Sequence, residues 1–344
     1  MKELIKQNSD SLVKDLRQMI DETRSQVAVA VNAGLTILYW RIGSRIRTEV
    51  LQNERAEYGE QIVASVSRQL TAEYGKGFAR PNLFRMLKFA EQFPDEQIVS
   101  TLSRQLSWSH FLEIQAVKND LARDFYAEMC RFERWSVRTL RERINSMLFE
   151  RTAISRKPEE TIKRELEVLR DDQKLTPDLV FRDPYFLEFL NLADSYSEKD
   201  LEGATLRELE RFLLELGSDF AFIARQKRIT IDDEDYYLDL LFYHRKLRRL
   251  ILLELKIGKL KAADIGQIEL YLRWLDKHER QTGEDAPIGL ILCTEKGGQM
   301  VELLELEQRG IRVAEYLTEL PPRELLEQKL LEAVRRARLE SENK

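Results

Sequence analysis

Two apolar stretches decide the fold of this chain: Tyr236-Tyr-Leu-Asp-Leu-Leu-Phe-Tyr-His244 and Leu250-Ile-Leu-Leu-Glu-Leu-Lys256. Both are short and rich in aromatic and aliphatic residues, which predicts two buried strands. A charged side chain inside a buried strand is costly unless another group pairs with it. The three charged side chains within these strands, Asp239, Glu254 and Lys256, therefore indicate a functional site.

The expected strand geometry brings these three side chains together. Side chains alternate along a strand, so Glu254 and Lys256 point to the same face. The short basic segment 244–249 predicts a hairpin turn, which places Asp239 on the neighbouring strand near Glu254. Two converging carboxylates form the oxygen-rich site that Mg²⁺ or Mn²⁺ prefers. A lysine beside them can polarise a water molecule, so the pattern predicts metal-assisted phosphodiester hydrolysis.

A simpler interpretation of the same residues stays open. Asp239 can be an acid at a strand edge that pairs with an arginine such as Arg225. Glu254 and Lys256 can form the solvent face of an amphipathic strand, alternating with leucines. The catalytic interpretation is favoured for Asp239 because Leu238 and two following leucines flank it.

The spacing of the charged residues resembles a known nuclease motif. Asp239, followed after about fifteen residues by Glu254-Leu-Lys256, is similar to the core of the PD-(D/E)xK nucleases. An expected helix over 201–216 and a strand over 220–225 precede the motif. A helix that contains Gln267 follows it, and then a strand over 287–293. This order of helix, three strands, helix and strand resembles the restriction-endonuclease-like αβββαβ core.

Further segments extend the resemblance to nearly the whole chain. Residues 212–217, 239–244 and 289–293 are similar to the YhcG-type (DUF1016) bacterial proteins, which join such a nuclease domain to an N-terminal domain of unknown function. Residues 39–43 and 74–78 resemble that N-terminal domain. The proline of the motif name is absent here, since Leu238 precedes Asp239, and this position varies within the superfamily.

The resemblance implies a role for each site residue. The Asp239 and Glu254 carboxylates and the Leu255 backbone carbonyl would bind Mg²⁺ or Mn²⁺, and Lys256 would orient the attacking water or help to deprotonate it. A helix glutamate would bind the metal directly or through water; Glu202 is preferred and Glu210 is the alternative. The catalytic set is completed by Gln267, so that its members are Glu202, Asp239, Glu254, Lys256 and Gln267.

The chain is long enough for two domains. Residues 1–155 have apolar positions at spacings of three and four throughout, which predicts an all-α domain with helices that include 12–20 and 27–46. Residues 62–70 and 98–106 are similar in sequence; a duplicated helix-turn-helix-like element is one interpretation, and coincidence between two amphipathic segments is the favoured one. We expect a connection over 156–182 and the nuclease domain over 183–344, with a charged helix near its end.

A basic segment in the helical domain is a second candidate site. Residues 67–88 contain five cations against one acid, Glu73, with Tyr74 and Phe78 interleaved. A basic, glycine-containing turn before a helix can bind backbone phosphates, although a solvated charged face is an equally open interpretation. The candidate nucleic-acid-binding residues are Arg68, Lys76, Arg80, Arg85 and Lys88.

Composition excludes several other classes of protein. No run of about 18 apolar residues is present, so no membrane helix is expected, and the first residues lack a signal-peptide core. Cys130 and Cys293 stand far apart in apolar contexts, which predicts buried, reduced thiols rather than a zinc site. The resemblance to the YhcG-type proteins implies the cytoplasm of a bacterium. The net charge is −5, but residues 1–156 hold 24 Lys and Arg against 20 Asp and Glu, so the acidic excess lies in the second half.

These observations predict a metal-dependent nuclease that hydrolyses DNA and whose helical domain selects the substrate. The resemblance places such an enzyme in genome defence or repair. Two alternatives stay open, namely a nucleic-acid-binding protein that uses the nuclease fold as a scaffold, and an RNA nuclease. A homo-oligomer is also open, because nucleases that cut both strands often form dimers.

Overall fold

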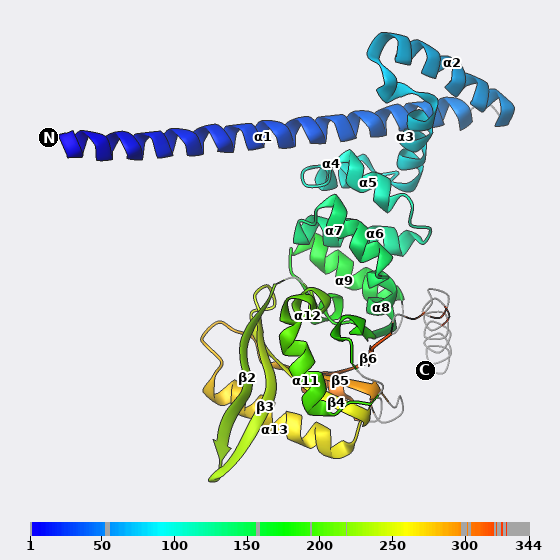
Figure 1. Ribbon diagram of the computed structural model, residues 1–344. Helices are drawn as coiled ribbons and strands as arrows, with labels where there is room; N and C mark the ends of the chain where they lie inside the picture. Colours follow the sequence, from blue (N-terminus) through cyan, green and yellow to red (C-terminus); the bar gives the residue numbers. More distant parts are fainter. Residues whose placement is uncertain are drawn as a thin grey trace. The chain divides into compact units, whose positions relative to one another are not determined.

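The structure is a computed structural model of the 344-residue chain. It describes residues 2–51, 56–155, 159–192, 195–217, 219–296 and 304–319, with residues 301, 321, 325 and 328. The chain divides into two compact units, residues 1–144 and 145–344, which are described one at a time (Figure 1). Most of the C-terminal helix expected near the chain end lies outside the described residues.

The first unit is helical, as the sequence predicted. After α1 (Lys2–Leu51) come α2 (Ala56–Tyr74), the short 3-10 helix η1 (Lys76–Phe78), α3 (Arg80–Gln92), α4 (Glu96–Ser103), α5 (Trp108–Ile114), α6 (Asp120–Glu133) and α7 (Val137–Asn145). The sequence predicted separate helices over 12–20 and 27–46, and this was wrong, because α1 runs through both without a break. The intervening residues 21–26 are polar but include neither proline nor glycine, so nothing stops the helix there.

The C-terminal part of α1 packs into the core of the first unit. Thr36 and Trp40 are buried, and the Trp40 ring N–H donates a hydrogen bond to the Phe93 carbonyl at 2.6 Å. Gly43 allows a close approach of two helices, since a Cβ atom there would lie 1.9 Å from the Met86 carbonyl oxygen on α3. The N-terminal half of α1 extends beyond α2–α5 (Figure 1).

One finding differs from the expectation that no segment can span a membrane. Residues 16–49 of α1 form a helix that is long and apolar enough to do so by length and composition alone. The sequence contains no run of 18 purely apolar residues, but scattered polar residues still leave an apolar average. The core helix of a soluble protein can pass the same test, so the finding by itself assigns no membrane role.

The second unit is built on a six-stranded sheet in the order β1-β6-β5-β4-β3-β2. Its strands are β1 (Tyr185–Phe186), β2 (Phe220–Ile231), β3 (Glu234–His244), β4 (Arg249–Lys259), β5 (Ile288–Glu295) and β6 (Ile311–Leu317). The predicted hairpin is present, because β3 and β4 pair antiparallel with His244 opposite Arg249. β5 then joins β4 in parallel, as expected for a crossover through a helix.

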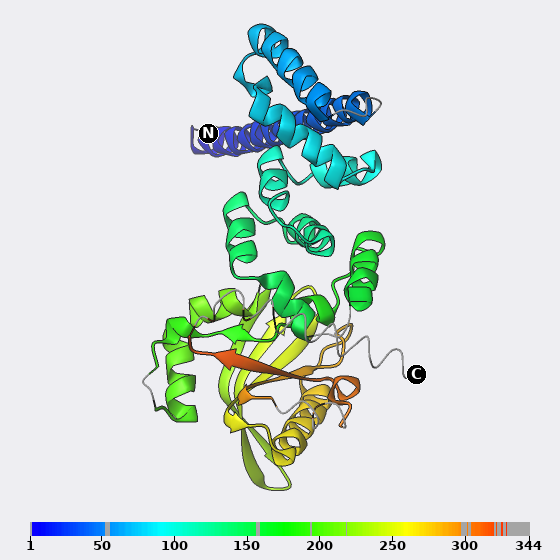
Figure 2. The same cartoon turned by 90° about the vertical axis from the view of Figure 1, so that its right-hand side faces the viewer.

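Helices cover both faces of this sheet (Figure 2). On one face, α11 (Glu198–Arg207) and α12 (Leu209–Leu216) bury Leu201 and Phe212 against alternate residues of β3 and β4. On the other face, α13 (Ala262–His278) buries Ile268 and Leu272 against the intervening residues. The single helix predicted over 201–216 is in fact two helices that meet at Glu208. The αβββαβ core predicted from the sequence is confirmed.

The residues before this core also contribute helices to the second unit. α8 (Leu148–Ser155), α9 (Glu159–Asp171) and α10 (Pro177–Val180) precede the sheet, with a 3-10 helix η2 (Glu188–Leu190) after β1 and another, η3 (Leu306–Arg309), before β6. The segment 156–182, expected to connect two domains, thus lies inside the second compact unit in its described part. A buried ion pair between Arg151 and Glu215 links α8 to α12.

Candidate active site

The β3–β4 hairpin opens at the point where the charged side chains lie. Backbone pairing of the two strands runs from His244–Arg249 to Leu240–Leu253 and stops there. Asp239 and Glu254 are the next residues along each strand and would be opposite each other in the same register. Instead of a backbone pair, the Leu255 N–H donates to Asp239 Oδ2 at 3.1 Å. Two carboxylates therefore occupy the space where the strands diverge.

Glu254 is the most deeply buried member of this site. Its residue is 3% exposed, and Oε1 accepts a long hydrogen bond of 3.4 Å from the Asp239 backbone N–H. Burial raises the pKa of Glu254 to about 8, and the negative charge of Asp239 acts in the same direction. Burial also raises the pKa of Asp239, although its bond from Leu255 opposes the shift. Both shifts follow mainly from burial, which disfavours the charged form of a carboxylate.

Lys256 provides positive charge beside these carboxylates. Its Nζ atom lies 3.8 Å from Glu254 Oε2 and 4.0 Å from Glu198 Oε2. Partial burial opposes the charged form of Lys256, but the surrounding carboxylates outweigh it and raise its pKa. Lys256 therefore remains a cation at neutral pH, and a protonated amine can orient a water molecule or balance negative charge but cannot accept a proton.

The structure distinguishes between the two helix glutamates considered from the sequence. Glu202 on α11 is buried and its charge acts on Asp239. Its Oε1 accepts a 2.7 Å hydrogen bond from Arg225 on β2. Glu210 lies on the exposed side of α12 instead. The geometry thus brings Glu202 to the site and leaves Glu210 outside it.

Gln267 reaches the site through Tyr271. Both residues lie on α13, where the Gln267 amide donates to the Tyr271 hydroxyl at 2.6 Å. Burial raises the pKa of Tyr271, and the charges of Glu254 and Asp239 act on it in the same direction. This places the Tyr271 hydroxyl near the carboxylate pair, with Gln267 behind it as a partner.

Two residues of the site, Gln226 and Glu198, were not predicted from the sequence. The Gln226 amide donates to Asp239 Oδ1 at 3.1 Å, from a position in β2 with a φ of 44°. Glu198, in the first turn of α11, accepts a 3.1 Å hydrogen bond from the Ile257 N–H. Glu198 had a sequence signal, because it lies four residues before Glu202 and thus on the same helix face. Gln226 had no signal in the sequence, because only its local backbone conformation directs its side chain to Asp239.

The donor set fits a hard divalent cation, in particular Mg²⁺. In proteins this ion is bound by one or two carboxylates and keeps several waters, and here two carboxylates converge beside the Leu255 peptide. Among the described residues, no group of three or more His, Cys, Asp or Glu side chains is arranged to hold a metal ion. Waters and the predicted Leu255 carbonyl would therefore complete the coordination.

The five cations of the basic segment lie together on neighbouring elements of the first unit. Arg68 is on α2, Lys76 on η1, and the remaining three on α3, and all five are exposed. Arg80 pairs with Glu60 at 3.0 Å. Gly75 has a φ of 91°, a conformation that favours glycine and turns the chain from α2 into η1. All five cations are thus accessible to solvent, and their role in binding nucleic acid stays a prediction.

Comparisons with known proteins agree with this geometry. Residues 15–151 match the model of the DUF1016 N-terminal domain, and residues 178–331 match that of the YhcG PDDEXK nuclease domain. The chain is 35% identical to the YhcG protein of Escherichia coli (strain K12), a candidate nuclease by its name, over 91% of each chain. The chain belongs to the YhcG family. Its second unit is therefore a PD-(D/E)xK nuclease domain, and nucleases of this class generally use divalent metal ions.

Solved structures give more distant matches. A repair endonuclease from Pyrococcus abyssi is 22% identical over 38% of this chain and 50% of its own, with a TM-score of 0.26. A complex of EndoMS with double-stranded DNA is 23% identical over 36% of this chain and 49% of its own, also with a TM-score of 0.26. The matched part of this chain thus spans about half the length of these structures.

Proposed function

We propose that the protein is a metal-dependent endonuclease that hydrolyses DNA, with Mg²⁺ or Mn²⁺ as its cofactor. The observation that carries this proposal is the meeting of Asp239, Glu254 and Lys256 where the β3–β4 hairpin opens. The three residues lie on two paired, buried strands, and in an ordinary sheet such strands carry only apolar side chains. Placing two acids and a lysine there costs stability, which indicates that the arrangement serves chemistry.

Each residue has a role that follows from its contacts. Asp239 and Glu254 would hold the divalent cation, which supplies Lewis-acid stabilisation of the charge that develops on the phosphate. Lys256, kept protonated by the surrounding carboxylates, would orient the attacking water and balance charge on the phosphate oxygens. Gln226 holds Asp239 through Oδ1, and Leu255 holds it through Oδ2. Asp239 is therefore fixed before the substrate arrives, which lowers the cost of reaching the reactive geometry.

The helical unit is proposed to select the substrate through its basic surface. Phosphate contacts from lysine and arginine fix a protein on nucleic acid, whereas they specify no sequence. The exposed positions of Arg68, Lys76 and Arg85 are suited to such contacts. We place the enzyme in the bacterial cytoplasm, where it would act in genome defence or repair as a homo-oligomer.

The proposal is tested by cleavage of plasmid, linear and single-stranded DNA with Mg²⁺, Mn²⁺ or EDTA. Asp239→Asn and Lys256→Met should each lower the rate by about 100-fold or more, since each removes a group that acts on the reacting atoms. Lys259→Met is the matched control, because Lys259 lies on the same strand and is exposed. Metal-independent cleavage, or cleavage retained in both site variants, would refute the assignment. Cleavage of RNA alone would keep the chemistry and replace the substrate.

A further inference from the structure

An apolar stripe follows one face of α1 over 23 residues and is exposed along its whole length. At its centre Val27 is 58% exposed, and at its ends Leu16 and Leu38 are 47% and 43% exposed. The spacings of four and three residues keep its members on one side of the helix. We call it the α1 stripe; it consists of Leu16, Ile20, Thr23, Val27, Val31, Gly34 and Leu38.

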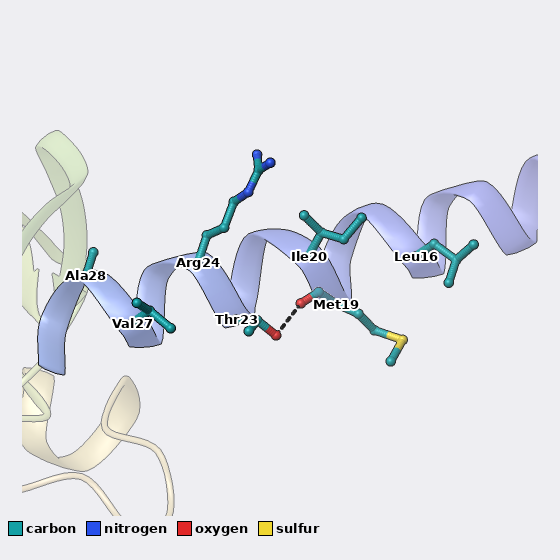
Figure 3. Close-up of a pocket in the computed structure, with 7 residues that line it drawn as sticks. All are labelled: Leu16, Met19, Ile20, Thr23, Arg24, Val27 and Ala28. Atoms are coloured by element: carbon teal, nitrogen blue, oxygen red, sulfur yellow. Dashed lines mark hydrogen bonds between the residues drawn. The ribbon is translucent and has the colours of Figure 1, made fainter. Parts of the chain in front are cut away.

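The rest of the first unit does not use the α1 stripe. At about 100° per residue, Thr36 and Trp40 project from the opposite side of the helix to Val27, and it is Thr36 and Trp40 that are buried in the core. All the residues that line the shallow hollow along the first half of the stripe come from α1 itself (Figure 3). The stripe is therefore not explained by the fold of the unit that contains it.

A membrane is the less favoured occupant. Of the segment 16–49 that is long and apolar enough to span one, the part after Thr36 is engaged in the core through Trp40 and Gly43. The part that remains contains the polar stretch 21–26, which includes Asp21, Glu22 and Arg24. These charges would have to enter the hydrocarbon region, at a cost of several kcal/mol. A protein surface covers the stripe without that cost.

The α1 stripe is complementary to itself when two copies run antiparallel. Its spacings of four, three, four, four, three and four residues read the same from either end. A two-fold axis at Val27 therefore sets Leu16 opposite Leu38 of the second copy. It also sets Ile20 opposite Gly34, where an added Cβ atom would meet nothing within 4 Å. A large side chain thus meets an open position, and no residue from 26 to 38 carries a charge.

The same register overlaps the two helices over their full length, because the midpoint of Lys2–Leu51 lies beside Val27. Over residues 16–38 the stripe is about 35 Å long at 1.5 Å per residue, so the contact between the two copies would continue over about six helical turns. We propose that α1 pairs with α1 of a second copy of this chain as an antiparallel, two-fold-symmetric helix pair centred on Val27.

The first test measures the mass of the full-length chain by light scattering across a range of concentrations. The wild-type chain should be a dimer, and Val27→Asp should weaken dimerisation by about ten-fold or more, because two carboxylates then face each other at the axis. Val29→Asp is the matched control, since Val29 is 47% exposed on the same helix but projects away from the stripe. Circular dichroism verifies that both variants keep their helices.

The second test determines the register by disulfide cross-linking. Both native cysteines are buried, so introduced thiols report the interface. Val27→Cys should cross-link to itself, and Leu16→Cys should cross-link only when mixed with Leu38→Cys. Cross-linking of Leu16→Cys to itself would indicate a parallel pair and would overturn the proposal. So would a monomeric wild-type chain, an undiminished dimer in Val27→Asp, or flotation of a monomer with phosphatidylglycerol vesicles.

Discussion

Glu254→Gln should stabilise the metal-free protein while it abolishes activity. The pKa of Glu254 is about 8 in the folded chain against an ordinary value of 4.5 for a glutamate. The folded state therefore holds a proton that the unfolded state releases between these two values. By linkage, the contribution of Glu254 to the free energy of unfolding is largest below pH 4.5 and decreases as the pH rises to about 8. A neutral glutamine has no proton to lose, so the variant should not show this decrease.

The magnitude follows from the same two values. A difference of 3.5 pKa units between 8 and 4.5 corresponds to about 5 kcal/mol at 1.36 kcal/mol per unit, which is the upper limit for this group. Because Glu254 is 3% exposed, solvent screening reduces this value little. The raised pKa of Lys256 affects stability only above the ordinary lysine pKa of 10.5, and so outside the pH range between 4.5 and 8. We expect the wild-type chain to lose several kcal/mol of stability between pH 5 and pH 8.5.

The assay is chemical unfolding in EDTA at pH 5 and pH 8.5, with Glu295→Gln as a control at an exposed position of β5. The free energy of unfolding of the control should depend on pH as that of the wild-type chain does. At pH 8.5, Glu254→Gln should have the highest free energy of unfolding of the three proteins. Adding Mg²⁺ at pH 8.5 should stabilise the wild-type chain and leave Glu254→Gln little changed, since ligand binding favours the folded state only where a site exists. Equal pH dependence in wild-type chain and Glu254→Gln would refute the reasoning.

Two further changes test contacts around the site and in the helical unit. Arg225→Met removes the cation that pairs with Glu202 and leaves the site more negative. The Mg²⁺ concentration for half-maximal cleavage should therefore fall by about three- to ten-fold. Arg228→Met, on the same strand, should leave this concentration unchanged. Gly43→Ala places a Cβ atom 1.9 Å from the Met86 carbonyl oxygen, so the first unit should be destabilised by about 3 kcal/mol. Calorimetry measures this, and an unchanged unfolding transition would refute the close packing of α1 on α3.

The sequence was sufficient for the part of the site that depends on strand periodicity. Alternation along 250–256 put Glu254 and Lys256 on one face, and the hairpin turn brought Asp239 to them. These relations are local, so they need no knowledge of the rest of the fold. The helix start at Ser197 is equally local, because the Ser197 hydroxyl accepts from the Asp200 N–H only three residues later.

The remainder of the site depends on contacts between distant segments. The sequence does not show that Arg225 of β2 meets Glu202 of α11, because the pairing depends on how α11 packs on the sheet. Nor does it show that β2 carries an irregular residue, Gln226, whose positive φ turns its amide to Asp239. For a similar reason the sequence predicted two helices where α1 is a single helix. A polar stretch in a periodic pattern is equally compatible with a loop and with an exposed helical turn.

The charges around the opened hairpin connect these observations to the proposed cofactor. Each cation present has an acid beside it: Lys256 lies near Glu254 and Glu198, and Arg225 pairs with Glu202. Four carboxylates against two cations leave two negative charges when all groups are ionised, and the raised pKa of Glu254 shows that the site resists reaching that state. One divalent cation supplies the missing two charges and would return Glu254 to its ionised form. The four carboxylates of the site are Asp239, Glu254, Glu202 and Glu198, of which Asp239 and Glu254 would hold the cation. We expect Mg²⁺ binding to release close to one proton at neutral pH, which calorimetry in buffers of different ionisation enthalpy measures.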